Sequence, residues 1–362
     1  MEGDELYELS GEAFQFLLRL SQGEVPEIKK EDEPFIEYCL SENLIRPSKV
    51  PLRRELKVHP SPVPSLRYLE LQITNRCNLQ CRHCYLGERG YEDLPFEKIR
   101  NILKEFEEIQ GLRLLISGGE PILHPRFWEI NEILRDHEFR SVLLSNGSLI
   151  TGELARRLKV HEVQLSLDGM KGGHDSLRGK GTFEKVLQAI DFLKEANIRV
   201  SIATMIHRNN LKEFDELASL IQFKEIEEWN VDAPCLSGRL KENPDLWVGP
   251  EEAGPYFQYG FGGGFHGSEK NTTCGVHLCA IMSDGKVCKC GLFSEEPVGS
   301  IDEGLRTCWE RIPRIQLREL NCKCSQLEDC RGGCRFRARY LGDIFQPDPF
   351  QCYARGVLKG GE

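Results

Sequence analysis

The positions of the cysteines constrain this chain more than any other feature. Three of the fifteen lie between residues 77 and 84, ten lie between residues 274 and 352, and only Cys39 and Cys235 lie elsewhere. The first residues are acidic, and no run of eighteen apolar residues exists, so neither a secretory signal nor a membrane span is expected. We therefore expect a cytoplasmic protein whose reduced thiols ligate metal in two separate regions, rather than forming disulfides.

Length and charge narrow the class further. The chain has 362 residues, of which 40% are hydrophobic, and this is enough for two or three packed domains. The formal net charge is −10. Because phosphate binding needs a cationic surface, nucleic acid is not expected as the main partner.

Residues 1–50 are expected to form a small helical module. Apolar side chains recur at helical spacing between Ser10 and Leu20, and a second helix is predicted over Pro34–Leu44. Five prolines between residues 47 and 64 forbid a regular helix, so residues 51–67 are interpreted as a linker.

Residues 68–240 show repeated alternation of strand-like and helical segments. This predicts an α/β fold, a partial barrel of six βα units with a parallel sheet and outer helices, short of the usual eight. Residues 250–362 lose the alternation and are rich in Gly and Cys, so a loop-rich domain held by metal is expected. The strands are predicted over Tyr68–Ile73, Leu112–Ser117, Arg140–Leu144, Glu162–Leu167, Ile198–Met205 and Ile226–Val231, and the helices near 95–109, 124–137, 151–159, 181–196 and 211–222.

A C-x3-C-x2-C triplet, formed by Cys77, Cys81 and Cys84, follows the first predicted strand. Three thiolates on one tight loop can hold three irons of a cubane cluster and leave the fourth iron open to a small molecule. A zinc site or free thiols are the alternative. Structural zinc usually takes four ligands, however, and no fourth Cys or suitably placed His follows.

Polar, glycine-bearing segments follow the next strands on the rim where barrel active sites are built. A turn glycine with a capping Ser or Asp would explain any one of them, but not all of them together. The carbonyls and the carboxylate of the first can accept hydrogen bonds from an ammonium group, the hydroxyl and carboxylate of the later ones suit a ribose, and the arginine suits a carboxylate. The segments are Gly118-Gly119-Glu120-Pro121, Ser145-Asn146-Gly147, Ser166-Leu167-Asp168-Gly169 and His174-Asp175 with Arg178-Gly179.

In order and placement, these motifs resemble those of radical S-adenosylmethionine (SAM) enzymes. The resemblance implies that one electron from a 4Fe-4S cluster cleaves SAM to methionine and a 5′-deoxyadenosyl radical, which abstracts hydrogen from an unreactive C–H bond. A reduced flavodoxin- or ferredoxin-type donor is implied as a partner. The implied residues are Cys77, Cys81 and Cys84 for the cluster; Gly118, Gly119 and Glu120 for the SAM amine; Ser166 and Arg178 for its carboxylate; and Asn146 and Asp168 near the ribose.

The C-terminal cysteines resemble the SPASM extension of radical SAM enzymes that modify peptides. Its marks are Gly-x4-Cys, here Gly285 to Cys290, and a later Cys-x5-Cys-x3-Cys. The resemblance implies two auxiliary 4Fe-4S clusters, one held by Cys274, Cys279, Cys290 and Cys334, and the other by Cys322, Cys324, Cys330 and Cys352.

One departure from the SPASM pattern affects the second cluster. Only Lys323 separates Cys322 from Cys324, where the family commonly has two residues. Cys288 or Cys308 could substitute as a ligand, although a buried free thiol is the alternative for each. Cys235 is interpreted either as a substrate contact at the barrel mouth or as a small buried hydrophobe.

The N-terminal module resembles, in part, the winged-helix domain that binds leader peptides; a helical cap is the alternative. The leading function is therefore modification of a ribosomally made peptide or protein, by cross-linking or side-chain oxidation. Sulfatase maturases usually place an Asp directly after Gly-x4-Cys, where this chain has Gly291. Synthesis of a tetrapyrrole or quinone cofactor is a third interpretation. A non-enzymatic electron carrier would leave the SAM-binding rim unexplained.

Overall fold

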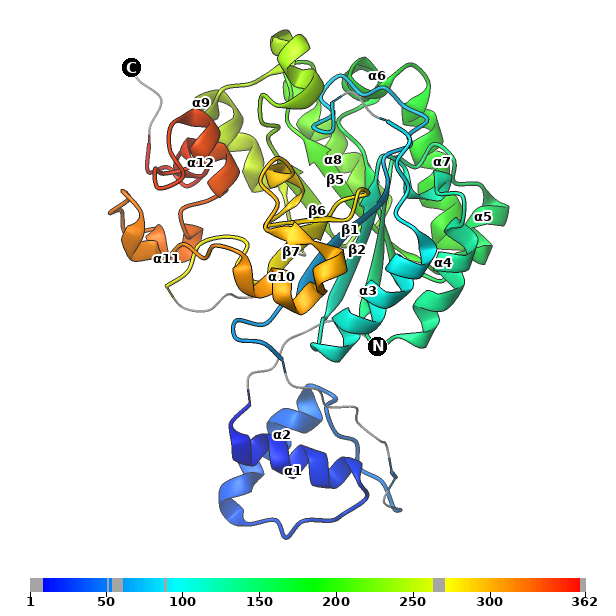
Figure 1. The fold of residues 1–362 in the computed structure, drawn as a ribbon, viewed down its shortest axis with the longest axis vertical. Coiled ribbons are helices and arrows are strands. Elements are labelled where there is room, and N and C mark those ends of the chain that lie inside the picture. The colour runs from blue at the N-terminus through cyan, green and yellow to red at the C-terminus, as the bar shows by residue number, and fades with distance from the viewer. Residues whose placement is uncertain (1–8, 51, 54–60, 88–89, 263–270, 359–362) are drawn as a thin grey trace. The chain divides into compact units, whose positions relative to one another are not determined.

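The computed structural model describes residues 9–50, 52–53, 61–87, 90–262 and 271–358. The chain divides into two compact units, of which residues 5–59 form the smaller and residues 60–362 the greater part of the larger (Figure 1). No helix in the described part of the chain is long and apolar enough to cross a membrane.

The smaller unit contains two helices, α1 (Gly11–Ser21) and α2 (Glu33–Ser41). Ser10 caps α1, because its hydroxyl accepts a hydrogen bond from the amide of Ala13 at 3.1 Å. The rings of Phe16 and Phe35 pack edge to face, with centroids 6.0 Å apart. Residues 9–50, all of which are described, include no strand.

The larger unit is built on one nine-stranded sheet with the order β6-β5-β4-β3-β2-β1-β7-β8-β9. Neighbours from β6 to β7 pair in parallel, whereas β8 and β9 are antiparallel additions. The first six strands confirm the predicted six βα units. The strands are β1 (Tyr68–Thr74), β2 (Arg113–Gly118), β3 (Arg140–Ser145), β4 (Glu162–Ser166), β5 (Arg199–Met205), β6 (Trp229–Asp232), β7 (Leu278–Ile281), β8 (Lys286–Cys288) and β9 (Gly299–Ser300).

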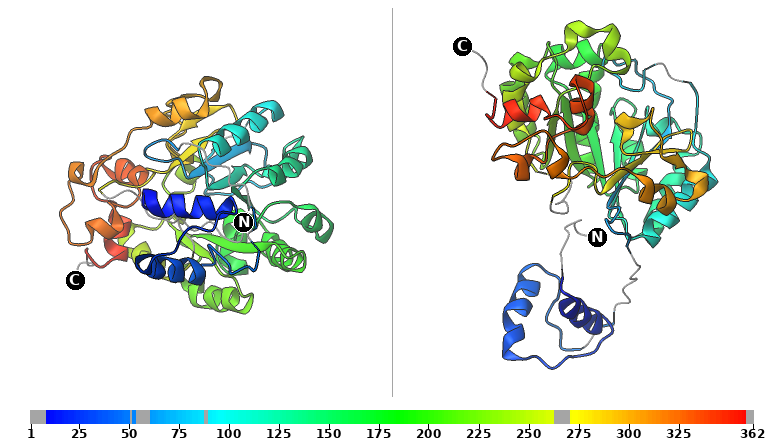
Figure 2. Two further views of the ribbon diagram at one scale, coloured as in Figure 1. Left: turned by 90° about the horizontal axis from the view of Figure 1, so that it is seen from below. Right: turned by 60° about the vertical axis from the view of Figure 1, so that its left-hand side comes forward.

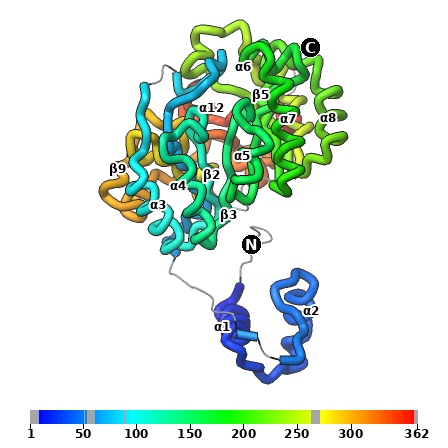
Figure 3. Tube along the Cα trace, turned by 90° about the vertical axis from the view of Figure 1, so that its right-hand side faces the viewer, coloured from blue at the N-terminus to red at the C-terminus, as the bar shows by residue number. Residues whose placement is uncertain are grey.

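Helices cover the outer side of the parallel strands (Figures 1 and 3). Their apolar faces are buried in one continuous core with the strands, which excludes water from both. The connecting helices are α3 (Phe96–Glu108), α4 (Phe127–Ile133), α5 (Gly152–Arg157), α6 (Lys171–Arg178), α7 (Thr182–Glu195) and α8 (Phe214–Phe223).

The C-terminal third adds short elements at the β1 edge of the sheet and on the side away from α4, α5 and α7 (Figure 2). We predicted irregular loops here, but β7 joins β1 and so extends the barrel sheet. The strand is only four residues long, too short to show an alternation in the sequence. The helices are α9 (Pro250–Ala253), α10 (Leu305–Arg311), α11 (Leu327–Cys330), α12 (Arg335–Leu341) and α13 (Pro349–Ala354).

Short 3-10 turns complete the chain at several element ends, where the last turn of a helix commonly tightens. They span Lys30–Asp32, Pro121–Leu123, Leu134–Asp136, Leu211–Glu213, Gly238–Glu242, Pro244–Leu246, Gly254–Tyr259, Gly291–Phe293, Ile301–Glu303 and Leu317–Glu319.

Candidate functional site

The C-x3-C-x2-C loop begins directly after β1, at the carboxyl end of the parallel sheet. Cys81 is buried, with 6% of its surface exposed, whereas Cys77 and Cys84 are half-buried. The amide of Arg82 donates to the carbonyl of Leu177 at 2.9 Å and so ties the loop to α6. The three thiols therefore share one anchored loop, as a cubane cluster with an open iron requires.

The Gly118-Gly119 segment lies directly against the cysteine loop. The amide of Gly119 donates to the carbonyl of Thr74 at 2.9 Å, and the next amide donates to the carbonyl of Arg76 at 2.7 Å. Gly118 has a φ of +148°, and a Cβ there would lie 2.1 Å from the oxygen of Thr74. A Cβ on Gly119 would lie 2.3 Å from the oxygen of Arg76. Two glycines are needed because the two backbones touch.

Glu120 joins this segment to the end of β3. Its buried carboxylate accepts hydrogen bonds from the Ser145 hydroxyl at 3.0 Å and from the Asn146 amide at 2.9 Å. Burial raises the pKa of Glu120 to about 7, although these two hydrogen bonds act in the opposite direction. The side-chain amide of Asn146 donates in turn to Asn78 at 3.0 Å, inside the cysteine loop.

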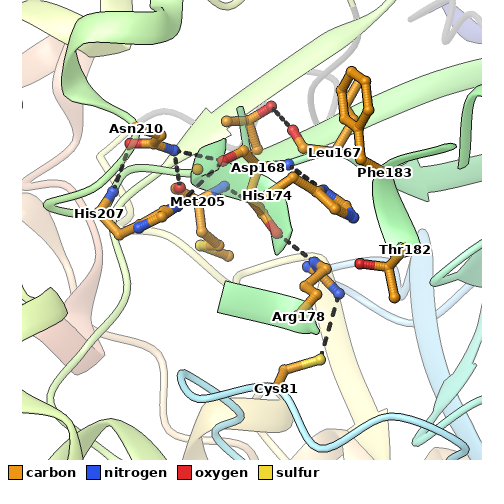
Figure 4. Close-up of polar contacts among 12 residues, drawn as sticks. Cys81, Leu167, Asp168, His174, Arg178, Thr182, Phe183, Met205, His207 and Asn210 are labelled. Atoms are coloured by element: carbon orange, nitrogen blue, oxygen red, sulfur yellow. Dashed lines mark hydrogen bonds and ion pairs between the residues drawn. The ribbon is translucent and has the colours of Figure 1, made fainter. Parts of the chain in front are cut away.

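Arg178 and Asp168 form a buried ion pair beside Cys81 (Figure 4). The guanidinium of Arg178 donates to the Asp168 carboxylate, and its Nη1 also lies 4.0 Å from the sulfur of Cys81. Burial opposes the charge of Asp168, but Arg178 and the neighbouring histidines outweigh it and lower the pKa of the carboxyl. Arg178, expected to meet the SAM carboxylate, is thus also positioned by Asp168 toward a cluster cysteine.

His207 and Asn210, which no sequence motif indicated, complete the hydrogen-bond network around Asp168. Both donate to the carbonyl of Asp168, at 3.1 Å and 2.9 Å. His174 accepts a hydrogen bond from the Asp168 amide at 3.1 Å, and burial lowers its pKa to about 4, so it is neutral at pH 7. His207 and Asn210 both follow β5. The earlier rim segments were identified as polar residues that follow a strand, and the same signal could have identified these two residues.

These segments surround a cavity of about 520 Å³. The buried carboxylates of Glu120 and Asp168 hydrogen-bond to the lining residues Ser145 and Arg178, while the other predicted SAM contacts line the cavity themselves. Residues of the C-terminal third line the same cavity. The lining includes Cys77, Cys81, Cys84, Gly118, Gly119, Asn146, Ser166, Arg178 and Cys235 from the barrel, and Cys290, Cys334 and Arg337 from the C-terminal third.

Three of the four cysteines expected to hold the first auxiliary cluster lie together. Cys290 and Cys334 line the same cavity, and Cys274 accepts a hydrogen bond at 3.4 Å from the amide of Arg335, the residue after Cys334. Burial raises the pKa of Cys290, and the charges of Cys334 and Cys274 contribute. Cys235 lines the same cavity, and Cys334 is the charged group that most raises its pKa after burial.

Cys279 lies elsewhere. It is fully buried within β7 and belongs to the hydrophobic core together with Cys308. Its neighbour Leu278 lines the cavity, and because successive side chains of a strand point to opposite faces, Cys279 faces away from it. The structure therefore does not bring Cys279 together with the other three expected ligands.

The cysteines expected to hold the second auxiliary cluster do lie together. The sulfurs of Cys322 and Cys324 are 3.9 Å apart. Burial raises the pKa of Cys352 to about 11, and the charges of Cys322 and Cys330 contribute. Cys288 and Cys308, the proposed substitutes, are both buried away from this group.

The donor sets of these groups consist of thiols. Thiolates are the ligands that hold 4Fe-4S clusters in proteins, so the chemistry of the donors fits such clusters. Over the ranges that the structure describes, no three His, Cys, Asp or Glu side chains come close enough to hold one metal ion.

Comparison with known proteins decides the family. The family model of the Radical SAM superfamily matches residues 71–221. The mycofactocin maturase MftC of Mycobacterium tuberculosis is 35% identical over 325 residues, which cover 78% of this chain and 81% of that protein. The chain belongs to the radical SAM superfamily. The AdoMet-dependent heme synthase of Methanosarcina barkeri is 28% identical over 339 residues and matches over 97% of its length.

Solved radical SAM structures share the fold. Streptococcus suis SuiB bound to its precursor peptide SuiA superposes with a TM-score of 0.61 at 15% identity, over 88% of this chain and 87% of that one. Native anSMEcpe with bound AdoMet gives a TM-score of 0.61 at 20% identity, over 80% and 94%. The predicted α/β fold with a parallel sheet, and the prediction of a radical SAM enzyme with a SAM-binding 4Fe-4S cluster, are confirmed.

Proposed function

We propose that this radical SAM enzyme modifies a ribosomally made peptide or protein, by forming a cross-link or by oxidising a side chain. The observation that carries the proposal is the single cavity of about 520 Å³ that joins the C-x3-C-x2-C loop to Cys290 and Cys334. A substrate in this cavity would touch both the site of radical formation and a second group of thiols. Among the relatives, MftC is named as a maturase, and SuiB was solved with a precursor peptide.

Within this site, SAM binding is assigned to the rim. Gly118 and Gly119 would meet the amine with their carbonyl oxygens, and Glu120 would act there by holding this segment through its hydrogen bonds with Ser145 and Asn146. Ser166 and Arg178 would hold the carboxylate. Asn146 would lie near the ribose, and Asp168 would act there through Arg178, because its carboxylate is already engaged. When bound, the cluster supplies the electron that cleaves SAM, and a flavodoxin- or ferredoxin-type donor would reduce it.

The first auxiliary cluster is assigned to Cys274, Cys290, Cys334 and Cys235. The last replaces Cys279, because Cys235 lines the cavity with Cys290 and Cys334, whereas Cys279 is buried in the core. The second cluster is assigned to Cys322, Cys324, Cys330 and Cys352, because the charges of the first three all raise the pKa of Cys352 in addition to its burial.

Synthesis of a tetrapyrrole cofactor is the second candidate, because the heme synthase match extends over 97% of that protein. One experiment distinguishes peptide modification from tetrapyrrole synthesis. Reduced enzyme and SAM are incubated with short peptides encoded beside the gene, or with iron-coproporphyrin, and the masses are followed. A peptide that loses two hydrogens supports the proposal. An unchanged set of peptides, together with a converted porphyrin, would replace it with the second candidate.

A further inference from the structure

A carboxylate that has no assigned role so far lies on the wall of the cavity. Glu70 is half-buried in the middle of β1 and lines the cavity, whereas its neighbours Leu69 and Leu71 are fully buried in the core. Alternation along the strand therefore turns Glu70 toward the space where a substrate would lie. A carboxylate in such a place costs desolvation free energy, so its presence calls for a function.

The hydrogen bonds that the structure records to Glu70 come from neutral groups. The hydroxyl of Ser117 donates at 3.0 Å, the side-chain amide of Gln72 at 3.3 Å and the backbone amide of Gly291 at 3.3 Å. The hydroxyl of Tyr85 lies at 3.5 Å. These donors fix the orientation of the carboxylate on the wall of the cavity.

Glu70 contacts residues next to both cysteine groups. Tyr85 directly follows Cys84 in the first loop, and Gly291 directly follows Cys290 in the second. A Cβ built on Gly291 would lie 2.9 Å from both carboxylate oxygens of Glu70. The carboxylate thus fills the space that a side chain at position 291 would otherwise occupy, between the site of radical formation and the first auxiliary group.

We propose that Glu70 is the proton acceptor for the substrate, an inference that rests on the proposed peptide modification. A substrate C–H bond breaks homolytically, and its hydrogen atom leaves with the 5′-deoxyadenosyl radical as 5′-deoxyadenosine. An adjacent N–H, O–H or S–H group of the substrate then releases its proton to a carboxylate oxygen of Glu70. A bound, oxidised iron–sulfur cluster would accept the remaining electron, and the new bond forms at the carbon. The substrate has then lost two protons and two electrons, which together equal two hydrogen atoms.

The test compares hydrogen abstraction with product formation in the same samples. The substrate is the peptide that the wild-type enzyme converts, deuterated at the reacting carbon. In the variant E70Q, deuterium should still reach 5′-deoxyadenosine, while product formation falls about a hundredfold, the usual contribution of a general base. The matched control E97Q makes the same change on the exposed face of α3, where Glu97 pairs with Arg100 at 2.7 Å, and should behave as wild type.

A second variant supplies the carboxylate from position 291 instead of position 70. E70A removes it, and the double variant E70A/G291D returns one to the same space, so product formation should recover at least tenfold over E70A alone. Unchanged product in E70Q, loss of deuterium transfer in E70Q, or absence of recovery in E70A/G291D would each overturn the proposal. Failure of the proposed function is distinguishable, because it appears in the wild-type arm as a peptide of unchanged mass.

Discussion

The amide of Gly119 donates a hydrogen bond to the carbonyl of Thr74 at 2.9 Å, and this contact holds the Gly118-Gly119 segment against the end of β1, where the cysteine loop begins. The thiols and the backbone groups assigned to SAM are therefore positioned by one another. Changes that separate the two segments should disturb cluster and SAM together.

Replacing Gly118 by Ala should weaken SAM binding at least tenfold. The new Cβ would lie 2.1 Å from the oxygen of Thr74, at a φ of +148° that L-residues rarely adopt. Calorimetric titration with SAM measures the effect. Gly342→Ala is the matched control, because a Cβ there has no neighbour within 4 Å, and it should bind SAM as wild type does. Equal affinities for both variants would contradict the assignment of this segment.

Replacing Asp168 by Asn should destabilise the protein by about 3–5 kcal/mol, because it leaves the guanidinium of Arg178 buried without its counter-charge. Thermal unfolding of the anaerobic protein measures this loss. The double variant D168N/R178M removes both charges and should recover stability but still fail to cleave SAM. If the double variant cleaved SAM normally, the pair would have only a structural role.

The free energy of unfolding should fall as the pH rises from the pKa of Glu120 in the unfolded chain to its pKa in the folded protein. The pKa of Glu120 is about 7 in the folded state and near 4.5 in the unfolded chain. As the pH rises, Glu120 therefore loses its proton more readily in the unfolded chain, and this lowers the free energy of unfolding. Between pH 5 and pH 8, the unfolding free energy of wild type should therefore fall by roughly 2 kcal/mol relative to that of E120Q. Denaturant titrations at both pH values check this, and a shift of the opposite sign would show that the carboxylate is stabilised by a charge.

Iron content should separate the two candidates for the first auxiliary ligand. Three cubane clusters give about twelve irons per chain. Cys235→Ala should lose up to about four of them or alter the electron paramagnetic resonance spectrum of that cluster, because a ligand is missing. Cys279→Ala, a change in the core beside Cys308, should leave both unchanged. The reverse result would return the ligand role to Cys279.

Much of the barrel could be predicted from the sequence, because its strands and helices are long enough to show their periods. One element that could not be predicted is α6. It contains Gly172 and Gly173, which favour helix poorly, and it is stabilised from a distance: Glu213 accepts hydrogen bonds from the amides of Met170 and Gly173, at 2.8 Å and 3.0 Å. A cap supplied from forty residues away leaves no local signal.

Two other differences concern the sixth strand and Cys279. The sixth strand begins at Trp229 rather than at Ile226, because its pairing with β5 begins at Trp229, opposite Ile202. Spacing identified the cysteine groups, but it could not show that Cys279 faces the core, because the strand that turns it there is formed only by pairing with β1.

The most direct test of the central claim is the formation of 5′-deoxyadenosine from SAM by the reduced, reconstituted protein, compared with the variant C77A/C81A/C84A. We predict that wild type releases 5′-deoxyadenosine and methionine in equal amounts. The triple variant should release neither and retain about eight of about twelve irons. Release of 5′-deoxyadenosine by the triple variant, or none by fully loaded wild type, would contradict the account.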